Sequence, residues 1–101
     1  QKIEEKKYTK WFDYDKIKDS PCVRTRRQGD YLTVNSEGGK KKLNRIFIDE
    51  KIPAEMRDRI PVVAAGSEIL WIPGGRMNEK YKITSTTGRV LELHYQGGAL
   101  A

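Results

Sequence analysis

Apolar residues along this chain fall into short runs separated by polar turns, and most of these runs have the length and composition of β-strands. The strands that this pattern predicts cover residues 22–26, 31–34, 62–65, 68–72, 81–84 and 90–95. The aromatic and acidic residues at 11–15 predict a further anchor strand, whose rings cover the edge of the core. Turns rich in glycine and proline separate the runs, as expected for an antiparallel sheet.

The period changes in the middle of the chain, where Leu43, Ile46 and Phe47 lie at helical spacing. This spacing predicts a helix over residues 41–50. A second, short helix is expected from Pro53, at its first position, to about Ile60. The fold class that follows is mainly β with two short helices, an α+β domain dominated by an antiparallel sheet.

Length and charge narrow the class of protein. A chain of 101 residues makes one domain, with residues 1–20 read as a lead-in from an upstream domain, 21–95 as the domain and 96–101 as a tail. The net charge of +6 favours nucleic acid, an anionic membrane or an acidic protein as partner. No apolar run approaches the roughly 20 residues of a membrane span, so we expect no membrane partner. The single Cys22 excludes an internal disulfide framework and fits the reducing cytoplasm.

Residues able to support catalysis do not form a recognisable set. His94 is the only histidine, and its place between Leu93 and Tyr95 predicts an outward-facing, structural side chain. Cys22 has no paired histidine, and we expect it to be a small buried residue. The carboxylate pairs at 13 and 15 and at 49 and 50 are interpreted as solvated surface groups that pair with nearby lysines. No catalytic residue and no metal or cofactor site are therefore expected in this chain.

Basic residues recur in clusters beside turns and helix ends, and they are the candidate RNA-binding residues. The candidates are Arg24, Arg26, Arg27, Lys40, Lys41, Lys42, Arg57, Arg59 and Arg76. Lysines at a helix N-terminus oppose the helix dipole, so the run at 40–42 is not explained by local stability. Free N–H groups at that helix end would add to the ammonium charges and suit a phosphate.

Other interpretations of these clusters stay open. A lysine run is often only a solvated face. Arg57 or Arg59 can pair with Glu55 or Asp58, and Arg76 can bridge to Asp30 or Glu79 instead of meeting a ligand. Because no base-reading device is recognisable in the sequence, the pattern favours recognition of a structured RNA or duplex through its shape and backbone.

The same segments, taken in order, resemble the C-terminal domain of the tRNA(Ile)-lysidine synthetase family. The resemblance covers about residues 20–95. It depends on the residues at 24–30, 39–43, 47–53, 57–61 and 69–76. The resemblance implies a β-sandwich-like fold with helices, akin to a domain of the phenylalanyl-tRNA synthetase β subunit.

The resemblance also implies a function. Members of the family use ATP to convert the wobble cytidine of an isoleucine tRNA to lysidine, and the C-terminal domain helps to bind the tRNA. Their catalytic loop of the Ser-Gly-Gly-x-Asp-Ser type does not occur in this sequence. The expected function is therefore that of a non-catalytic tRNA-binding domain, whose partners are tRNA and an upstream catalytic domain that uses ATP. A structural module that packs against that domain or forms a homodimer, without touching RNA, is the alternative.

Overall fold

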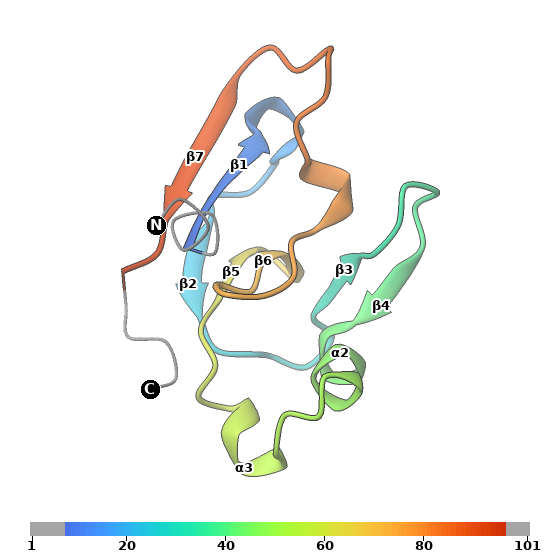
Figure 1. Ribbon diagram of the computed structural model, residues 1–101, viewed down its shortest axis with the longest axis vertical. Helices are drawn as coiled ribbons and strands as arrows, with labels where there is room; N and C mark the ends of the chain where they lie inside the picture. Colours follow the sequence, from blue (N-terminus) through green and yellow to red (C-terminus); the bar gives the residue numbers. More distant parts are fainter. Residues whose placement is uncertain (1–7, 97–101) are drawn as a thin grey trace.

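The structure, a computed structural model, describes residues 8–96 of the chain, so residues 97–101 of the expected tail at 96–101 lie outside them. Its strands are β1 (Thr9–Asp13), β2 (Cys22–Arg24), β3 (Tyr31–Thr33), β4 (Lys40–Lys42), β5 (Val62–Ala65), β6 (Glu68–Trp71) and β7 (Val90–His94). Its helices are α2 (Leu43–Asp49) and α3 (Ala54–Arg57), with 3₁₀ turns η1 (Tyr14–Lys16) and η2 (Glu79–Tyr81). The prediction of a mainly β domain with two short helices is confirmed (Figure 1).

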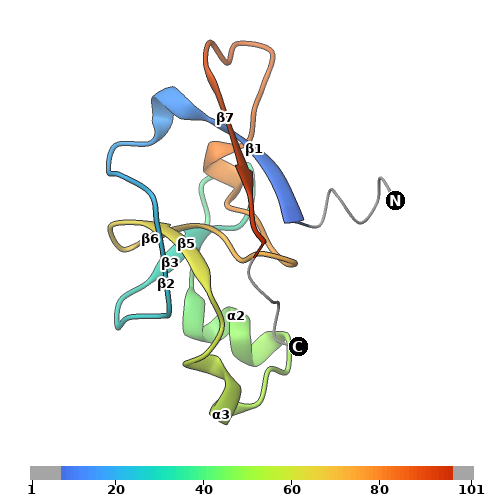
Figure 2. The same cartoon turned by 90° about the vertical axis from the view of Figure 1, so that its left-hand side faces the viewer.

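The strands form two sheets. One has five strands in the order β2-β5-β6-β3-β4, and the other pairs β1 with β7. The five-stranded sheet lies between the β1–β7 pair on one side and the two helices on the other (Figure 2). Two of its inner strands, β5 and β6, are mostly buried, because neighbours cover both faces of the sheet.

Alternation along β5 divides the core into two clusters. Val62 and Ala64 face the helices and pack with Phe47 and its neighbours, while Val63 and Ala65 face the β1–β7 pair and pack with Phe12. A strand sends successive side chains to opposite faces, so four consecutive apolar residues serve both clusters. The two clusters together hold the helices and the β1–β7 pair on the central sheet.

The first strand, β1, lies within residues 1–20, which the sequence analysis interprets as a lead-in from an upstream domain. β1 pairs antiparallel with β7 along its whole length, from Thr9 opposite His94 to Asp13 opposite Val90. Phe12 is fully buried and lies 6.3 Å from the ring of Trp71, which confirms the predicted anchoring role for this ring. Trp11 and Tyr14 are exceptions, because 38% and 44% of their surfaces remain exposed.

Both predicted helices begin later in the structure than the sequence pattern suggests. Lys40–Lys42 is strand β4, paired with β3, and not the first turn of the helix, which begins at Leu43. The second helix is confined to Ala54–Arg57, with Pro53 just before it.

The strand predicted over 81–84 is wrong. Tyr81 ends the 3₁₀ turn η2, which Asn78 caps by accepting a hydrogen bond from the backbone N–H of Lys80. Lys82 makes an isolated antiparallel bridge with Phe12 of β1, and β7 pairs with β1 instead of with residues 81–84.

Cys22 and His94 lie on strands at the edges of the fold. Cys22 is exposed, so the prediction of a buried thiol is wrong, because β2 is an edge strand of its sheet. His94 faces outward as predicted, and its Nδ1 lies 2.9 Å from the Oγ1 of Thr9 on the paired strand.

Candidate nucleic-acid interface

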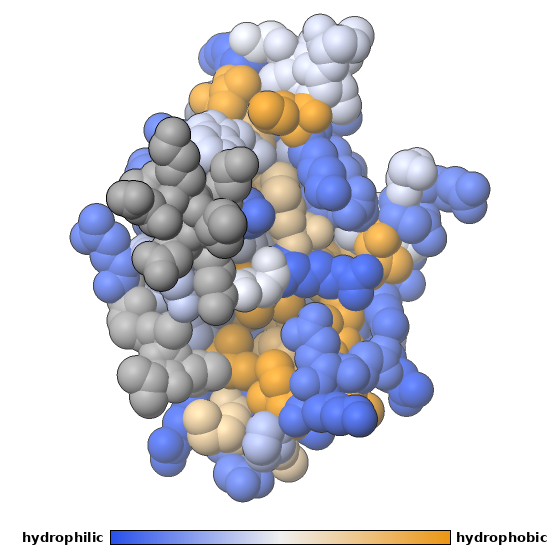
Figure 3. All heavy atoms as spheres, viewed as in Figure 1, coloured by the Kyte–Doolittle hydropathy of each residue, from blue (hydrophilic) through white to orange (hydrophobic). Residues whose placement is uncertain are grey.

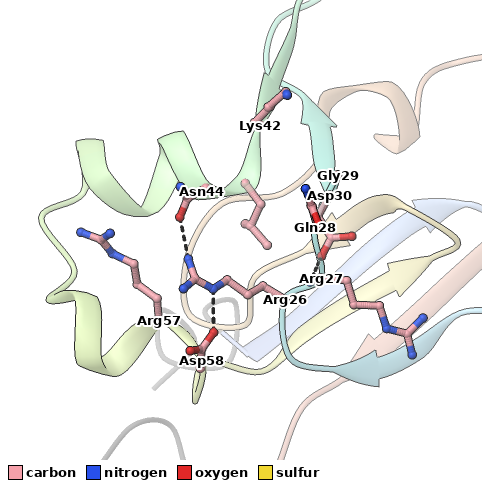
Figure 4. Close-up of a pocket in the computed structure, with 10 residues that line it drawn as sticks. Arg26, Arg27, Gln28, Gly29, Asp30, Lys42, Asn44, Arg57 and Asp58 are labelled. Atoms are coloured by element: carbon pink, nitrogen blue, oxygen red, sulfur yellow. Dashed lines mark hydrogen bonds and ion pairs between the residues drawn. The ribbon is translucent and has the colours of Figure 1, made fainter.

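A hollow of about 580 Å³ opens where three segments meet, and we call it the basic hollow. It is lined by residues 26–30, 42–44 and 57–58, which belong to the loop after β2, the junction of β4 with α2, and the end of α3 (Figure 4). Its volume lies within the roughly 300–1,000 Å³ of ligand sites. Four of its lining residues are basic and two are acidic.

Asp30 fixes the loop that forms one wall of the basic hollow. Its buried carboxylate accepts hydrogen bonds from Nη1 and Nη2 of Arg24, each at 2.9 Å, and from the backbone N–H of Arg27 at 2.7 Å. Its carbonyl accepts from the N–H of Leu43 at 2.9 Å, which attaches the loop to the start of α2. This N–H is therefore not available to a phosphate, contrary to the prediction for the helix end.

The side chain of Arg24 is largely buried and hydrogen-bonded within the protein. Its side chain is only 10% exposed, and it donates a further hydrogen bond to the carbonyl of Gly66 at 2.8 Å. The hydrogen bonds to Asp30 raise the pKa of Arg24, so this arginine keeps its charge and its partner. It remains a predicted RNA contact, but its donors already have acceptors within the protein.

Arg26 connects the loop to both helices. Its Nε donates to Oδ1 of Asp58 at 2.8 Å, and its Nη1 donates to Oδ1 of Asn44 at 2.6 Å (Figure 4). The sequence suggested a local partner for Asp58 on its own helix, Arg57 or Arg59. The structure instead pairs it with an arginine 32 positions away, and no local signal could have revealed that contact.

The remaining cations of the basic hollow are Arg27, Lys42 and Arg57. Arg27 and Lys42 are exposed, and in Figure 4 their charged ends point away from Arg26. Arg57 is half-buried, and its Nε donates to the carbonyl of Ile52 at 2.9 Å. None of the three forms an ion pair with a carboxylate among residues 8–96, in contrast to Arg24 and Arg26.

The other lysines of β4 point in different directions, because side chains alternate along a strand. Lys40 lies over the ring of Tyr31, 5.3 Å from its centroid. Lys41 forms an ion pair with Asp49 of α2, which also pairs with Arg45 at 3.3 Å. The hydrogen bond from Lys41 is the main cause that lowers the pKa of Asp49. Lys41 is therefore directed at the protein's own carboxylate.

Arg59 and Arg76 lie outside the lining of the basic hollow. Arg59 is exposed just beyond α3. Arg76 follows the turn after β6, and within the described part of the chain it pairs with neither Asp30 nor Glu79, which are bound by Arg24 and Lys82. The predicted residues thus divide into a group at the hollow and a group dispersed around it.

The structure adds residues that the sequence did not single out. Asn44 accepts a hydrogen bond from Arg26, and Gln28 lines the same hollow. Arg45 and Arg89 are further cations, but each is paired, with Asp49 and Asp15 respectively.

The described residues do not form a metal site or a membrane-spanning helix. Among residues 8–96, no group of three or more histidine, cysteine or acidic side chains is placed to hold a metal ion. Asp13 is buried and accepts a hydrogen bond from Thr87 at 3.0 Å, so it is not the solvated group that was predicted. Nor is any helix in the described range long and apolar enough to cross a membrane.

Comparison with known proteins gives a consistent result. The family described as the TilS substrate C-terminal domain matches residues 22–93. A tRNA(Ile)-lysidine synthase of Caldanaerobacter subterraneus subsp. tengcongensis is 51% identical over 88 residues, which is 87% of this chain and 19% of the relative. A tRNA(Ile)-lysidine synthase of Clostridium tetani is 41% identical over 90 residues, or 89% of this chain and 19% of the relative.

A solved structure agrees with these relatives. A crystal structure of a TilS C-terminal domain superimposes with a TM-score of 0.67 at 30% identity, covering 90% of this chain and 73% of the other. The chain spans about a fifth of the length of the curated relatives that it matches.

Proposed function

Because this chain belongs to the tRNA(Ile)-lysidine synthase family, we propose that it binds the tRNA substrate through phosphate contacts at the basic hollow. In this proposal Arg27, Lys42 and Arg57 make the principal contacts. Arg26 contributes only those N–H donors that are not already bonded to Asp58 and Asn44. Lys40, Arg59 and Arg76 extend the contact around the rim. Arg24 and Lys41 support the surface through their carboxylate partners and contribute least.

One observation carries the proposal. Three cations from three separate segments surround one hollow, and none of them has a carboxylate partner within the described chain. The two acidic residues in the lining are already bound, Asp30 by Arg24 and Asp58 by Arg26, so their charge is largely offset. Unpaired basic groups that a fold brings together are the electrostatic signature of a phosphate-binding surface.

The rest of the enzymatic reaction is proposed to lie outside this chain. The relatives named tRNA(Ile)-lysidine synthase are about five times as long as the segment matched here, which leaves room for a catalytic domain. The ATP-dependent attachment of lysine would take place on that domain, and this one would hold the tRNA. A location in the cytoplasm remains a prediction. The formation of a homodimer is also a prediction, and sedimentation of the purified protein tests it.

An exposed aromatic patch formed by Trp11, Phe12 and Trp71 would favour the alternative, a structural module that does not contact RNA. Phe12 and Trp71 are instead fully buried, and only Trp11 reaches the surface. Charge reversal at Lys40–Lys42 separates the two functions, because it lowers RNA affinity if the domain binds tRNA and leaves assembly unchanged.

A matched pair of substitutions tests the proposal more sharply. Lys42→Glu reverses a charge at the basic hollow, and Lys18→Glu reverses an exposed charge outside it. In titrations of tRNA at two salt concentrations, Lys42→Glu is expected to weaken binding and to reduce the salt slope by about one unit. Equal effects of the two substitutions, or no binding of tRNA even at low salt, would overturn the proposal.

A further inference from the structure

A second groove lies beside β1, away from the basic hollow, and we call it the indole groove. Its volume is about 260 Å³, and it is lined by Lys10, Trp11, Met77, Lys82 and Ile83. It forms because Lys82 pairs with Phe12 in an isolated antiparallel bridge, which brings the segment after η2 alongside β1. The β1–β7 pair lies on the opposite side of the central sheet from α2 and α3 (Figure 2).

Packing does not explain the position of Trp11. The neighbouring Phe12 and the other tryptophan, Trp71, are fully buried and belong to the core cluster between the sheets. Trp11 is 38% exposed and Ile83 is 48% exposed, so large apolar surface remains in contact with water. Apolar side chains also reach the surface near the end of β1 and the start of β7 (Figure 3). Exposed apolar surface that groups around a groove marks an interaction site.

Charge and size limit what the indole groove can bind. Both segments contribute a lysine to its lining, Lys10 on β1 and Lys82 after η2, and no carboxylate is among the lining residues. Lys82 pairs with Glu79 at 2.9 Å but keeps about half of its side chain exposed, and Lys10 has no ion pair within residues 8–96. The volume lies just below the roughly 300–1,000 Å³ of small-molecule sites, so the groove takes one ring system. A ligand that fits is flat and apolar in its centre and anionic at its edges.

We propose that the indole groove stacks an unpaired base of the bound RNA on Trp11, with the adjoining phosphates at Lys10 and Lys82. A base on an indole, flanked by cations along the backbone, is the usual arrangement for single-stranded nucleic acid. An acidic peptide would also meet the lysines, but an extended peptide gains main-chain hydrogen bonds only from an open strand edge. Here β7 occupies one edge of β1 and Lys82 bridges the other. The inference rests on the proposed function, because it takes RNA as the partner.

Tryptophan fluorescence of the 101-residue chain gives a direct test. The chain has two tryptophans and Trp71 is fully buried, so a ligand that contacts an indole quenches Trp11. A short single-stranded oligoadenylate is expected to quench the emission, and a peptide of alternating glutamate and leucine is not. In polarisation measurements with the labelled oligonucleotide, Trp11→Ala should lose roughly 5- to 150-fold in affinity. Trp11→Phe should keep most of it.

A matched variant and a second ligand separate the outcomes. Tyr14→Ala removes another exposed aromatic ring, outside the indole groove, and is expected to leave oligonucleotide binding unchanged. The inference is overturned if Trp11→Ala binds the oligonucleotide like the wild type, or if only the acidic peptide quenches Trp11. If Lys42→Glu still weakens tRNA binding in that case, the proposed function stands alone. If tRNA does not bind at all, both fail.

Discussion

Arg24 and Asp30 form a bidentate ion pair at the centre of the loop that carries the candidate RNA-binding arginines. Both terminal nitrogens of Arg24 donate to the carboxylate at 2.9 Å, and the side chains are 10% and 2% exposed. The carboxylate also accepts the backbone N–H of Arg27. The carboxylate of Asp30 thus fixes the conformation of the loop and, with it, the positions from which the side chains of Arg26 and Arg27 extend.

Asp30→Ala should destabilise the domain strongly. Removing the carboxylate leaves Arg24 buried without its partner, and breaking a buried pair in this way costs about 3–5 kcal/mol. The free energy of unfolding in a urea titration measures the loss. Asp58→Ala is the control, because that carboxylate is 76% exposed and its pair with Arg26 should contribute at most about 1 kcal/mol. Similar losses in the two variants would contradict the structural role of Asp30.

Phe12→Ala tests whether β1 belongs to the fold. Phe12 is fully buried between the sheets, and its truncation should cost about 3–5 kcal/mol through lost burial and an unfilled cavity. Tyr14→Ala, at a side chain that is 44% exposed, should cost far less. Thermal unfolding of both variants measures the difference. If Phe12→Ala melts at the wild-type temperature, β1 is an appendage and the domain begins after it.

The carboxylate of Asp49 should titrate at an unusually low pH. The hydrogen bond from Lys41 lowers its pKa below the ordinary value of 3.8. A lowered pKa in the folded state means that the pair contributes stability above pH 3.8, and that this contribution is lost as the pH falls through the folded-state pKa. An NMR titration of the carboxyl group measures it. Lys41→Met should move the midpoint upward, and an unchanged midpoint would show that Lys41 is not the cause.

Tyr81 should resist ionisation in alkaline solution. Burial raises its pKa, and its hydroxyl donates a hydrogen bond to Glu68 at 2.5 Å, where a phenolate would meet the carboxylate charge. Absorbance titration should therefore show one tyrosine that ionises only when the protein unfolds. Tyr81→Phe should remove that late step, and its persistence in the variant would assign the step to another tyrosine.

Local patterns were sufficient to predict much of the fold. The apolar runs at Tyr31–Thr33, Val62–Ala65 and Glu68–Trp71 became strands because their composition and turns agree with their burial. The helical spacing of Leu43, Ile46 and Phe47 became α2 because these three side chains share one buried face. In these segments, local preference and tertiary packing favour the same structure.

Long-range pairing could not be predicted in this way. β1 pairs with β7 across almost the whole chain, and of the strand predicted over 81–84 only Lys82 pairs, in a single bridge to Phe12. Lys40–Lys42 pairs with β3 as a strand of the sheet, although α2 begins at the next residue. For the candidate site, composition identified the basic residues, but only the fold showed that Arg24 and Lys41 are bound by carboxylates while Arg27, Lys42 and Arg57 are not.

The salt dependence of tRNA binding tests the central claim most directly. The measurement compares wild-type protein with a variant in which Arg27, Lys42 and Arg57 are all alanine, and plots the logarithm of affinity against the logarithm of salt concentration. Each lost phosphate contact removes roughly 0.7–0.9 from the slope, so the variant is expected to be shallower by about 2–3 units. A variant with the wild-type slope would show that the basic hollow does not bind the tRNA backbone.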